Sequence, residues 1–257
     1  MVKKQSMKKR IICIIPARLG SYRFPTKPFV DICGKSMIEH VYKRARLSKL
    51  IDEVYVATPN TEIKDHVEKF GGNVIMTSDD VRRASDRVAQ AATKVDEADI
   101  IINLQGDEPL VTPEMIESAL VPIINDPSIS CVSLARKVGY DEAKDIHEVK
   151  VVYDNEMNAL YFSREPIPSK FMGDKKIDYY IGVCVFPFTK ESLREFAELP
   201  STPLEITESI DMMRLIEHQK KVKIVITNNR TYSIDVPADV AKVIEVMKND
   251  KLKELYY

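Results

Sequence analysis

The sequence lacks the cysteine and histidine patterns that mark metal or redox proteins. Its four cysteines (Cys13, Cys33, Cys131 and Cys184) are scattered and form no C-x-x-C pair, and its four histidines show no ligand spacing, which argues against a zinc site. Three of the cysteines lie in apolar runs and are typical of small core side chains in a reducing compartment. We therefore expect a cytoplasmic protein.

Long apolar runs and a dominant charge are also missing. No run approaches the ~18 residues of a membrane helix, and the run Ile11–Ile15 after the basic start is too short for a signal peptide. We expect residues 1–10 to form a solvated tail, and no membrane insertion. With 38 Lys and Arg against 39 Asp and Glu, the net charge is −1, so no global basic field would attract nucleic acid.

Two nucleotide-binding fingerprints are absent as well. The chain has no G-x-x-x-x-G-K-[ST] sequence, so it is not a Walker-type nucleotide hydrolase. It has no G-x-G-x-x-G sequence after its first predicted strand, which disfavours a nicotinamide dehydrogenase. No internal repeat and no low-complexity segment is present either.

What the chain does have is an alternation of short apolar runs and amphipathic segments. This pattern predicts strands at Ile11–Ile15, Val54–Ala57, Val74–Met76 and Ile100–Leu104, and helices at Met37–Leu47, Pro59–Phe70, Ala84–Val95 and from Thr112-Pro113 onward. Strands and helices that alternate at this spacing indicate an α/β fold, with a mainly parallel sheet covered by helices on both faces.

After residue 130 the pattern changes. It predicts strands at Cys131–Leu134, Val149–Tyr153, Ala159–Phe162, Tyr179–Phe188 and Val222–Thr227, and helices at Glu191–Glu198, Pro203–His218 and Pro237–Met247. The first strands follow one another closely, and Asp154-Asn155-Glu156 is typical of a hairpin turn. We expect one domain over residues 11–250, with an antiparallel flap or dimerisation region inserted at about 130–188.

The most informative stretch is Asp99–Pro109. The apolar run Ile100–Leu104 is typical of a strand buried on both faces, and it stops at Gly106, directly before Asp107 and Glu108. Ligands of open α/β sheets bind at the carboxyl ends of such strands. An acidic pair there predicts a ligand site, although a polar turn would explain the pattern as well.

A second candidate is the loop Pro16–Pro28, directly after the first predicted strand. It carries Arg18, Arg23 and Lys27 together with Gly20 and Ser21. Backbone donors with guanidinium and ammonium groups would cradle a polyphosphate. Three solvated surface charges are the alternative, and the position after the first strand favours the phosphate interpretation.

Two further groups of acidic residues leave their roles open. Asp235 lies between a predicted strand and a predicted helix, where it could share one Mg²⁺ with Asp107 or could cap the helix, and spacing alone favours the cap. Thr202 and Glu205 form a capping box with Pro203 at the first helical position. Glu208, three residues after Glu205, could serve a site or be solvated.

Taken in order, these motifs resemble one family. IIPAR-x-x-S-x-R-x-P-x-KP, NLQGDEP, ALYFSR-x-PIP, the Pro-Leu-Glu-x-x-Glu helix and ID-x-P-x-D, which span residues 11 to about 245, are similar to 3-deoxy-manno-octulosonate (Kdo) cytidylyltransferases, the CMP-Kdo synthetases. The resemblance implies a Rossmann-like nucleotide-diphosphosugar transferase fold and a homodimer. It also implies transfer of CMP from CTP to the anomeric hydroxyl of a sugar acid, with loss of pyrophosphate, for surface polysaccharide or lipopolysaccharide synthesis.

The resemblance also implies site residues. It places Arg18, Lys27 and Asp107 in catalysis and Mg²⁺ on Asp107 and Asp235. The implied nucleotide-binding residues are Arg18, Ser21, Arg23, Lys27, Ala84, Ser85 and Gln105. The implied residues on the sugar-acid side are Arg164, Tyr180, Glu205, Glu208 and Met212.

The chain departs from the family pattern where the acceptor is expected. Tyr180, Cys184 and Met212 stand where the family has His, Tyr and Gln, and Ser78 and Ala84 differ near the nucleotide. A site built to hydrogen-bond a hydroxyl discriminates strongly against a substrate that lacks it. We therefore expect Kdo or a close relative as acceptor. The alternatives are another acid, such as an amino-dideoxy-ulosonate, or a nucleotide-binding protein without catalysis.

Overall fold

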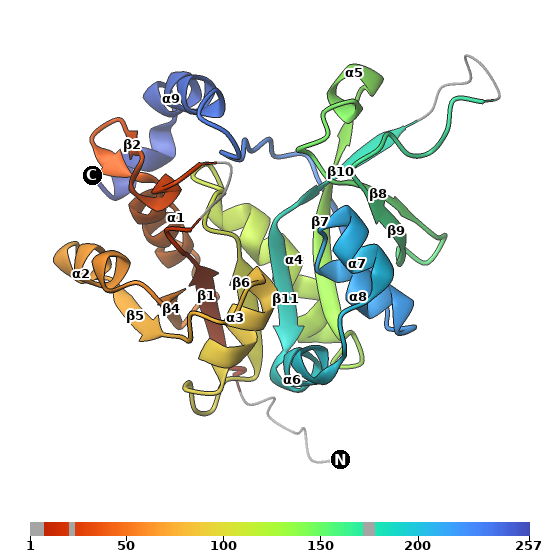
Figure 1. Cartoon of the computed structure of the whole chain (residues 1–257), viewed down its shortest axis with the longest axis horizontal. Coiled ribbons are helices and arrows are strands. Elements are labelled where there is room, and N and C mark those ends of the chain that lie inside the picture. Colours follow the sequence, from red (N-terminus) through yellow and green to blue (C-terminus); the bar gives the residue numbers. More distant parts are fainter. Residues whose placement is uncertain (1–7, 21–23, 172–177) are drawn as a thin grey trace, which may run out of the picture.

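A ten-stranded mixed sheet organises the chain in the computed structural model, which describes residues 8–20, 24–171 and 178–257. Four neighbouring strands at one side of the sheet are parallel: β5 (Asn73–Met76), β4 (Glu53–Thr58), β1 (Ile11–Pro16) and β6 (Ile100–Leu104). All four predicted parallel strands are thus confirmed, and β1 and β6 lie side by side at the centre of Figure 1.

The other side of the sheet is largely antiparallel, as expected for the region after residue 130. The order continues with β11 (Val185–Thr189), β7 (Cys131–Val138), β10 (Tyr179–Val183), β8 (Lys150–Tyr153) and β9 (Ala159–Ser163). The β8–β9 pair is the predicted hairpin, and β12 (Val222–Thr227) runs parallel to β7. A separate small hairpin joins β2 (Asp31–Ile32) to β3 (Lys35–Ser36).

Helices cover both faces of the sheet because the parallel strands bury side chains on both sides. In β1, Ile11, Cys13 and Ile15 belong to one apolar core, and Ile12 and Ile14 belong to the other. The first core is closed by α1 (Met37–Arg46), α2 (Thr61–Lys69) and α4 (Pro113–Asn125), and the second by α3 (Ala84–Ala92), α6 (Lys190–Glu198) and α8 (Met212–Glu217). The predicted fold class is confirmed.

The remaining elements lie outside these layers. They are α5 (Tyr140–Ala143), α7 (Pro203–Glu208), α9 (Asp239–Lys248) and the 3-10 helices η1 (Lys27–Phe29) and η2 (Lys251–Leu255). Helix α9 packs against the β2 hairpin through Val243, Met247 and Ile32. Across the three described ranges, every helix is too short or too polar to cross a membrane.

One predicted strand is in fact two. The sequence predicts a single strand over Tyr179–Phe188, but the structure interrupts it at Cys184, between β10 and β11. Both pieces pair with β7, through Val183 opposite Leu134 and Phe188 opposite Cys131, so the β10–β11 side has two more residues than its partner. This irregularity resembles a β-bulge, which redirects side chains. It turns Cys184 toward the cavity described below.

One predicted helix is also two. The pattern predicts a helix over Pro203–His218, but α7 ends at Glu208 and α8 begins at Met212. Ser209 between them has φ 55°, a left-handed conformation that ends a helix. Residues 209–211 include neither glycine nor proline, so the sequence carries no strong signal for the break. Glu208 and Met212 therefore lie on different helices.

Candidate active site

A cavity of about 480 Å³ opens where β1 and β6 end, which is where the predicted ligand site lies. Gly106 brings the two strand ends together, since a Cβ atom there would lie 2.9 Å from the carbonyl oxygen of Pro16. The cationic side chains that line the cavity belong to Arg18, Lys27, Arg82, Arg83, Arg87 and Arg164. The acidic ones belong to Asp107, Glu108, Glu148, Asp211 and Asp235.

The first loop contributes two of its predicted cations to this cavity. Arg18 is exposed at its rim, and the Lys27 ammonium donates to Asp107 Oδ2 and to the carbonyl of Ile234, each at 2.8 Å. Burial, and secondarily the charge of Arg18, lowers the pKa of Arg87, so two guanidinium groups lie near each other. Such a group of cations favours an anionic ligand. Ser21 and Arg23 lie outside the described residues.

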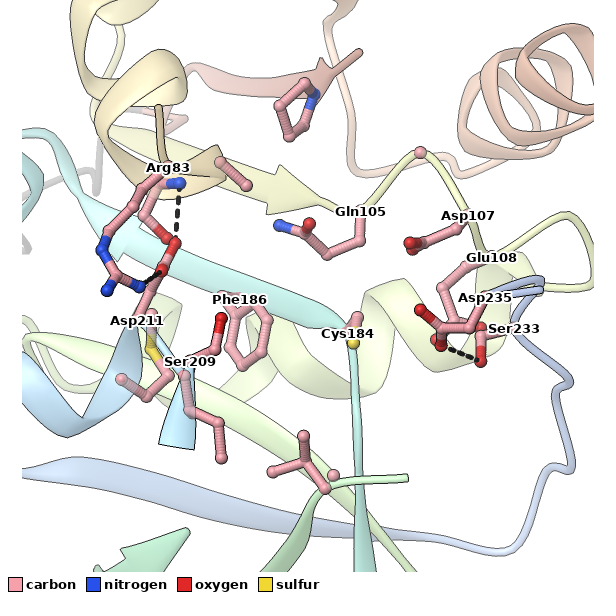
Figure 2. A pocket seen from close by; sticks show the side chains of 18 of the residues that line it. Arg83, Gln105, Asp107, Glu108, Cys184, Phe186, Ser209, Asp211, Ser233 and Asp235 are labelled. Atoms are coloured by element: carbon pink, nitrogen blue, oxygen red, sulfur yellow. Dashed lines mark hydrogen bonds and ion pairs between the residues drawn. The ribbon is translucent and has the colours of Figure 1, made fainter. Parts of the chain in front are cut away.

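Three carboxylates gather at the end of the cavity next to Lys27. Figure 2 shows Asp107 and Glu108, which follow β6, close to Asp235. The backbone N–H of Ile234 donates to the Asp107 carbonyl at 3.0 Å, which joins the segment before α9 to the end of β6. Residues far apart in the sequence are brought together by this one backbone contact.

Asp235 is not a helix cap. The carboxylate of Asp239 instead accepts the backbone N–H groups of Asp235 and Val236 at 2.8 and 2.9 Å. The Asp235 side chain lines the cavity, where it accepts a 3.3 Å hydrogen bond from Ser233. The capping role that spacing favoured is therefore wrong, because the N-cap residue of α9 is Ala238.

The carboxylates at this end of the cavity repel one another electrostatically. Glu108 is 3% exposed and accepts a 2.8 Å hydrogen bond from Thr231. Burial raises the pKa of Glu108 to about 8; the charges of Asp107, Glu148 and Asp235 add to the rise, and the Thr231 bond opposes it. A divalent cation between the carboxylates would relieve this repulsion.

The predicted Asp107 and Asp235 pair fits Mg²⁺ in its chemistry. Mg²⁺ needs only one or two protein carboxylates, since it keeps several waters and takes oxygens from substrate phosphates. Across residues 8–20, 24–171 and 178–257, no group of three or more His, Cys, Asp or Glu forms a cage for a metal. The oxygen donors of Asp107 and Asp235, facing a cavity lined by cations, suit a shared magnesium–phosphate site.

The predicted nucleotide residues Ala84, Ser85 and Gln105 all line the cavity. A chain of side chains connects two of them: Gln105 Nε2 donates to Asn103 Oδ1 at 2.8 Å, and Asn103 Nδ2 donates to Ser85 Oγ at 3.0 Å. Asn103 is fully buried, so it fixes both partners. These hydrogen bonds connect the start of α3 to the end of β6 along one wall of the cavity.

The predicted acceptor residues divide into two groups. Arg164 and Met212 line the cavity, as does Cys184, whereas Tyr180, Glu205 and Glu208 do not. Tyr180 packs against Tyr153 with ring centroids 5.1 Å apart. Of the three departures expected on the acceptor side, Cys184 and Met212 therefore line the cavity and Tyr180 does not.

Glu205 and Glu208 support the wall from behind. The Glu205 carboxylate is fully buried and pairs with Arg83 at 3.1 Å and Arg214 at 2.7 Å. The Glu208 carboxylate accepts the backbone N–H of Arg164 at 2.9 Å and the hydroxyl of Ser163 at 3.0 Å. Both face other residues of the chain and neither lines the cavity, so their role on the sugar-acid side stays a prediction.

Sequence reasoning missed several residues of the cavity wall. Arg83 and Asp211, paired at 3.1 Å, lie opposite the carboxylate end in Figure 2, with Ser209 beside them. Asp211 also accepts the backbone N–H of Ser85 at 3.0 Å. Asp211 was hidden by the expectation of an unbroken helix. Glu148 and His147 precede a predicted strand, and nothing in their spacing indicates a site.

Several known proteins resemble this chain over most of its length. A family model described as Cytidylyltransferase matches residues 12–224. The 3-deoxy-manno-octulosonate cytidylyltransferase of Geobacter sulfurreducens is 38% identical over 256 residues, covering 93% of this chain and 99% of the relative. The 8-amino-3,8-dideoxy-manno-octulosonate cytidylyltransferase of Shewanella frigidimarina is 42% identical over 239 residues, covering 91% and 96%.

A solved structure resembles it as well. It is described as CMP:2-keto-3-deoxy-manno-octonic acid synthetase complexed with CTP, and it matches with a TM-score of 0.87 at 36% identity. The match covers 94% of this chain and 99% of that one.

Proposed function

The chain belongs to the cytidylyltransferase family, and from that membership we propose that it transfers CMP from CTP to the anomeric hydroxyl of a 3-deoxy-ulosonic acid. The acceptor is Kdo or a close relative, and pyrophosphate is released. One observation carries this proposal: a single cavity combines Arg18, Lys27 and Arg87 with the carboxylates of Asp107 and Asp235. Such a cavity accommodates a triphosphate, a metal ion and an acid acceptor together.

The mechanism requires positioning and charge neutralisation more than covalent chemistry. The acceptor hydroxyl attacks the α-phosphorus of CTP in line, and the bond to pyrophosphate breaks. Lys27 and Arg18 stabilise the negative charge on the departing phosphates. Asp107 and Asp235 would hold Mg²⁺, which when bound supplies charge neutralisation and orientation.

The walls of the cavity have separate tasks. Gln105 and Ser85, fixed through Asn103, hold the nucleotide beside the start of α3. Arg164 faces the acceptor, and its Nε and Nη1 are anchored on the backbone carbonyls of Glu208, Ile146 and His147. A guanidinium held this firmly is suited to orient a carboxylate of the sugar acid.

The resemblance to CMP-Kdo synthetases supports three further expectations. The protein acts in the cytoplasm, its product serves surface polysaccharide or lipopolysaccharide synthesis, and two copies form a homodimer. Strand β9 supports the last of these, since it lies at the end of the strand order and exposes 56% of Leu160. Sheet edges with exposed apolar side chains favour pairing.

The test is a pyrophosphate-release screen of CTP, UTP and ATP against a panel of ulosonic acids. We expect release with CTP and a 3-deoxy-ulosonic acid, and dependence on both substrates. Release that requires no acid, or that favours UTP or ATP, would contradict the proposed reaction.

A further inference from the structure

Glu148 is a cavity carboxylate that the proposed reaction does not use. It lies on the segment between α5 and β8 and lines the cavity together with Val149 and Arg164. The other acidic lining residues each accept a hydrogen bond or ion pair from a protein group. Those partners are Lys27 for Asp107, Thr231 for Glu108, Arg83 for Asp211 and Ser233 for Asp235. From the described part of the chain, the Glu148 carboxylate receives neither.

The backbone that carries Glu148 is held rigidly. The ammonium of Lys150, which is fully buried, donates to the carbonyls of Asp145 and Glu148, each at 2.7 Å. Nη1 of Arg164 donates to the two carbonyls between them, those of Ile146 and His147, at 3.0 and 3.2 Å. Four consecutive carbonyls are thus fixed by two buried or half-buried cations. A carboxylate on such a support is pre-organised to bind a ligand.

The surroundings of Glu148 are electronegative. Burial raises the pKa of Glu148 to about 7; the charges of Asp145, Asp235 and Glu142 add to the rise, and Arg136 opposes it. Arg136 is itself paired with Glu142 at 2.6 Å. Lys150 and Arg164 donate to the backbone carbonyls of this segment and Arg136 pairs with Glu142, so these cations do not bind the Glu148 carboxylate itself. A cationic group entering the cavity is therefore stabilised beside that carboxylate.

The chemistry of this position favours an ammonium group over a metal ion or a hydroxyl. The proposed function already assigns its metal ion to Asp107 and Asp235, so Glu148 is left to contact the acceptor. A neutral hydroxyl would leave the negative charge in place. An ammonium group forms charge-assisted hydrogen bonds to one carboxylate and neutralises it.

We infer that Glu148 binds an ammonium group on the acceptor, and that the acceptor is an amino-substituted 3-deoxy-ulosonic acid. This inference rests on the proposed function and names the substrate within its class. Relatives that act on 8-amino-3,8-dideoxy-manno-octulosonate are 41% and 42% identical to this chain, so an acceptor of that kind is compatible with the fold. Glu148 is then a specificity-determining residue at the acceptor wall.

The test compares two acceptors that differ by the amino group, 8-amino-3,8-dideoxy-manno-octulosonate and 3-deoxy-manno-octulosonate. We expect the kcat/KM of the wild type to be at least about 10-fold higher for the 8-amino sugar acid than for 3-deoxy-manno-octulosonate. This factor is the lower bound for a charge-assisted contact. Glu148→Gln keeps the size and hydrogen-bonding capacity of the side chain but removes the charge. This variant should lower kcat/KM for the 8-amino sugar acid by about 10- to 150-fold. Its kcat/KM for 3-deoxy-manno-octulosonate should stay within about 3-fold of the wild-type value.

Two controls accompany this variant. Asp141→Asn removes a negative charge from α5, where the side chain is 95% exposed and outside the cavity wall, and it should leave the acceptor ratio unchanged. Glu148→Asp keeps the charge and should retain part of the preference. The thermal melting temperature of each variant shows whether it is folded.

The outcomes separate the two levels of the argument. If neither acid supports pyrophosphate release, the proposed function fails. If both sugar acids react but the wild type does not prefer the 8-amino sugar acid, the inference is wrong and the proposed function stands. The same holds if Glu148→Gln leaves the ratio of the two kcat/KM values unchanged. The acceptor preference is measured on the wild-type protein alone. The inference can therefore be contradicted even if the Glu148→Gln protein does not fold.

Discussion

Two groups of acidic side chains on opposite sides of the cavity wall differ in how their charge is balanced. The buried ion network consists of Asp86, Glu205 and Asp211 with Arg83 and Arg214. Arg214 donates to Asp86 at 2.7 Å and to Glu205 at 2.7 Å, and Arg83 pairs with Glu205 and Asp211. Every carboxylate of this network has a guanidinium partner.

The cavity carboxylates consist of Asp107, Glu108, Glu148 and Asp235. They include two groups, Glu108 and Glu148, whose pKa is raised by burial and by the neighbouring carboxylates. Charge that the protein balances internally holds the fold together. A carboxylate that lines the cavity is within reach of a metal ion or a substrate. Changes in the first group should therefore reduce stability, and changes in the second should reduce activity.

The largest effect should come from the buried ion network. Glu205→Gln removes the charge that Arg83 and Arg214 share, and breaking a buried ion pair costs about 3–5 kcal/mol. We expect a loss of this size in the free energy of unfolding, measured by urea denaturation. Glu198→Gln, at a side chain 71% exposed on α6, is the control and should change little. A loss below about 1 kcal/mol for Glu205→Gln would remove the contrast between the two groups.

Next in size is the metal pair. Asp235→Asn should lower kcat for pyrophosphate release by at least about 100-fold, or about 2.7 kcal/mol, because a bound metal supplies several kcal/mol of transition-state stabilisation. The melting temperature should change little, since the side chain lines the cavity and the N-cap residue of α9 is Ala238. Asp65→Asn on the exposed surface of α2 is the control. Turnover close to that of wild type would exclude Asp235 from the metal site.

A somewhat smaller effect should come from Lys27, the cation that pairs with Asp107. Lys27→Ala should lower kcat/KM for CTP by about 10- to 150-fold, which matches the ~1.5–3 kcal/mol of a charge-assisted contact. Lys69→Ala, exposed on α2, removes the same charge far from the cavity wall and should leave the CTP kinetics unchanged. Equal kinetics in both variants would show that the first loop does not bind the triphosphate.

The smallest effect concerns the pH dependence of stability. The pKa of Glu108 is raised from 4.5 to about 8, so between these values the folded state holds a proton that the unfolded state has lost. Stability therefore falls as pH rises through this window, by about 1.4 kcal/mol per pH unit for one such group. Glu108→Gln should reduce the slope of the free energy of unfolding between pH 6 and 7. An unchanged slope would mean that Glu108 is ionised in the folded protein.

The fold could be read from the sequence where short local patterns decide it. The alternation of apolar residues identified β1, β4, β5 and β6, and Thr112-Pro113 marked the start of α4, where Thr112 accepts the Met115 N–H at 3.3 Å. Local patterns failed at Ser209 and Cys184, where a left-handed residue and a two-residue irregularity interrupt apolar segments. Neither interruption involves glycine or proline, so neither has a strong local signal.

The site residues were likewise predictable only where local sequence places them. The loop after β1 and the carboxylates after β6 could be placed at strand ends, because parallel strands present their carboxyl ends at one edge. Spacing favoured a capping role for Asp235, and the backbone contact between Ile234 and Asp107 decided instead that it lines the cavity. Glu205 matched an acceptor motif, yet its two arginine partners come from distant segments and turn it away from the cavity.

The sequence by itself determined the α/β architecture, the family and the chemistry expected at the ends of β1 and β6. Those properties depend on residue types a few positions apart, which set backbone conformation and hydrophobic faces. Only the tertiary structure decided which charges are balanced inside the protein and which face the cavity. That distinction depends on partners far apart in the chain, as for Glu205 with Arg83 and for Glu148 on the segment held by Lys150 and Arg164. Burial and distance, which set the strength of each charge interaction, exist only in the folded molecule.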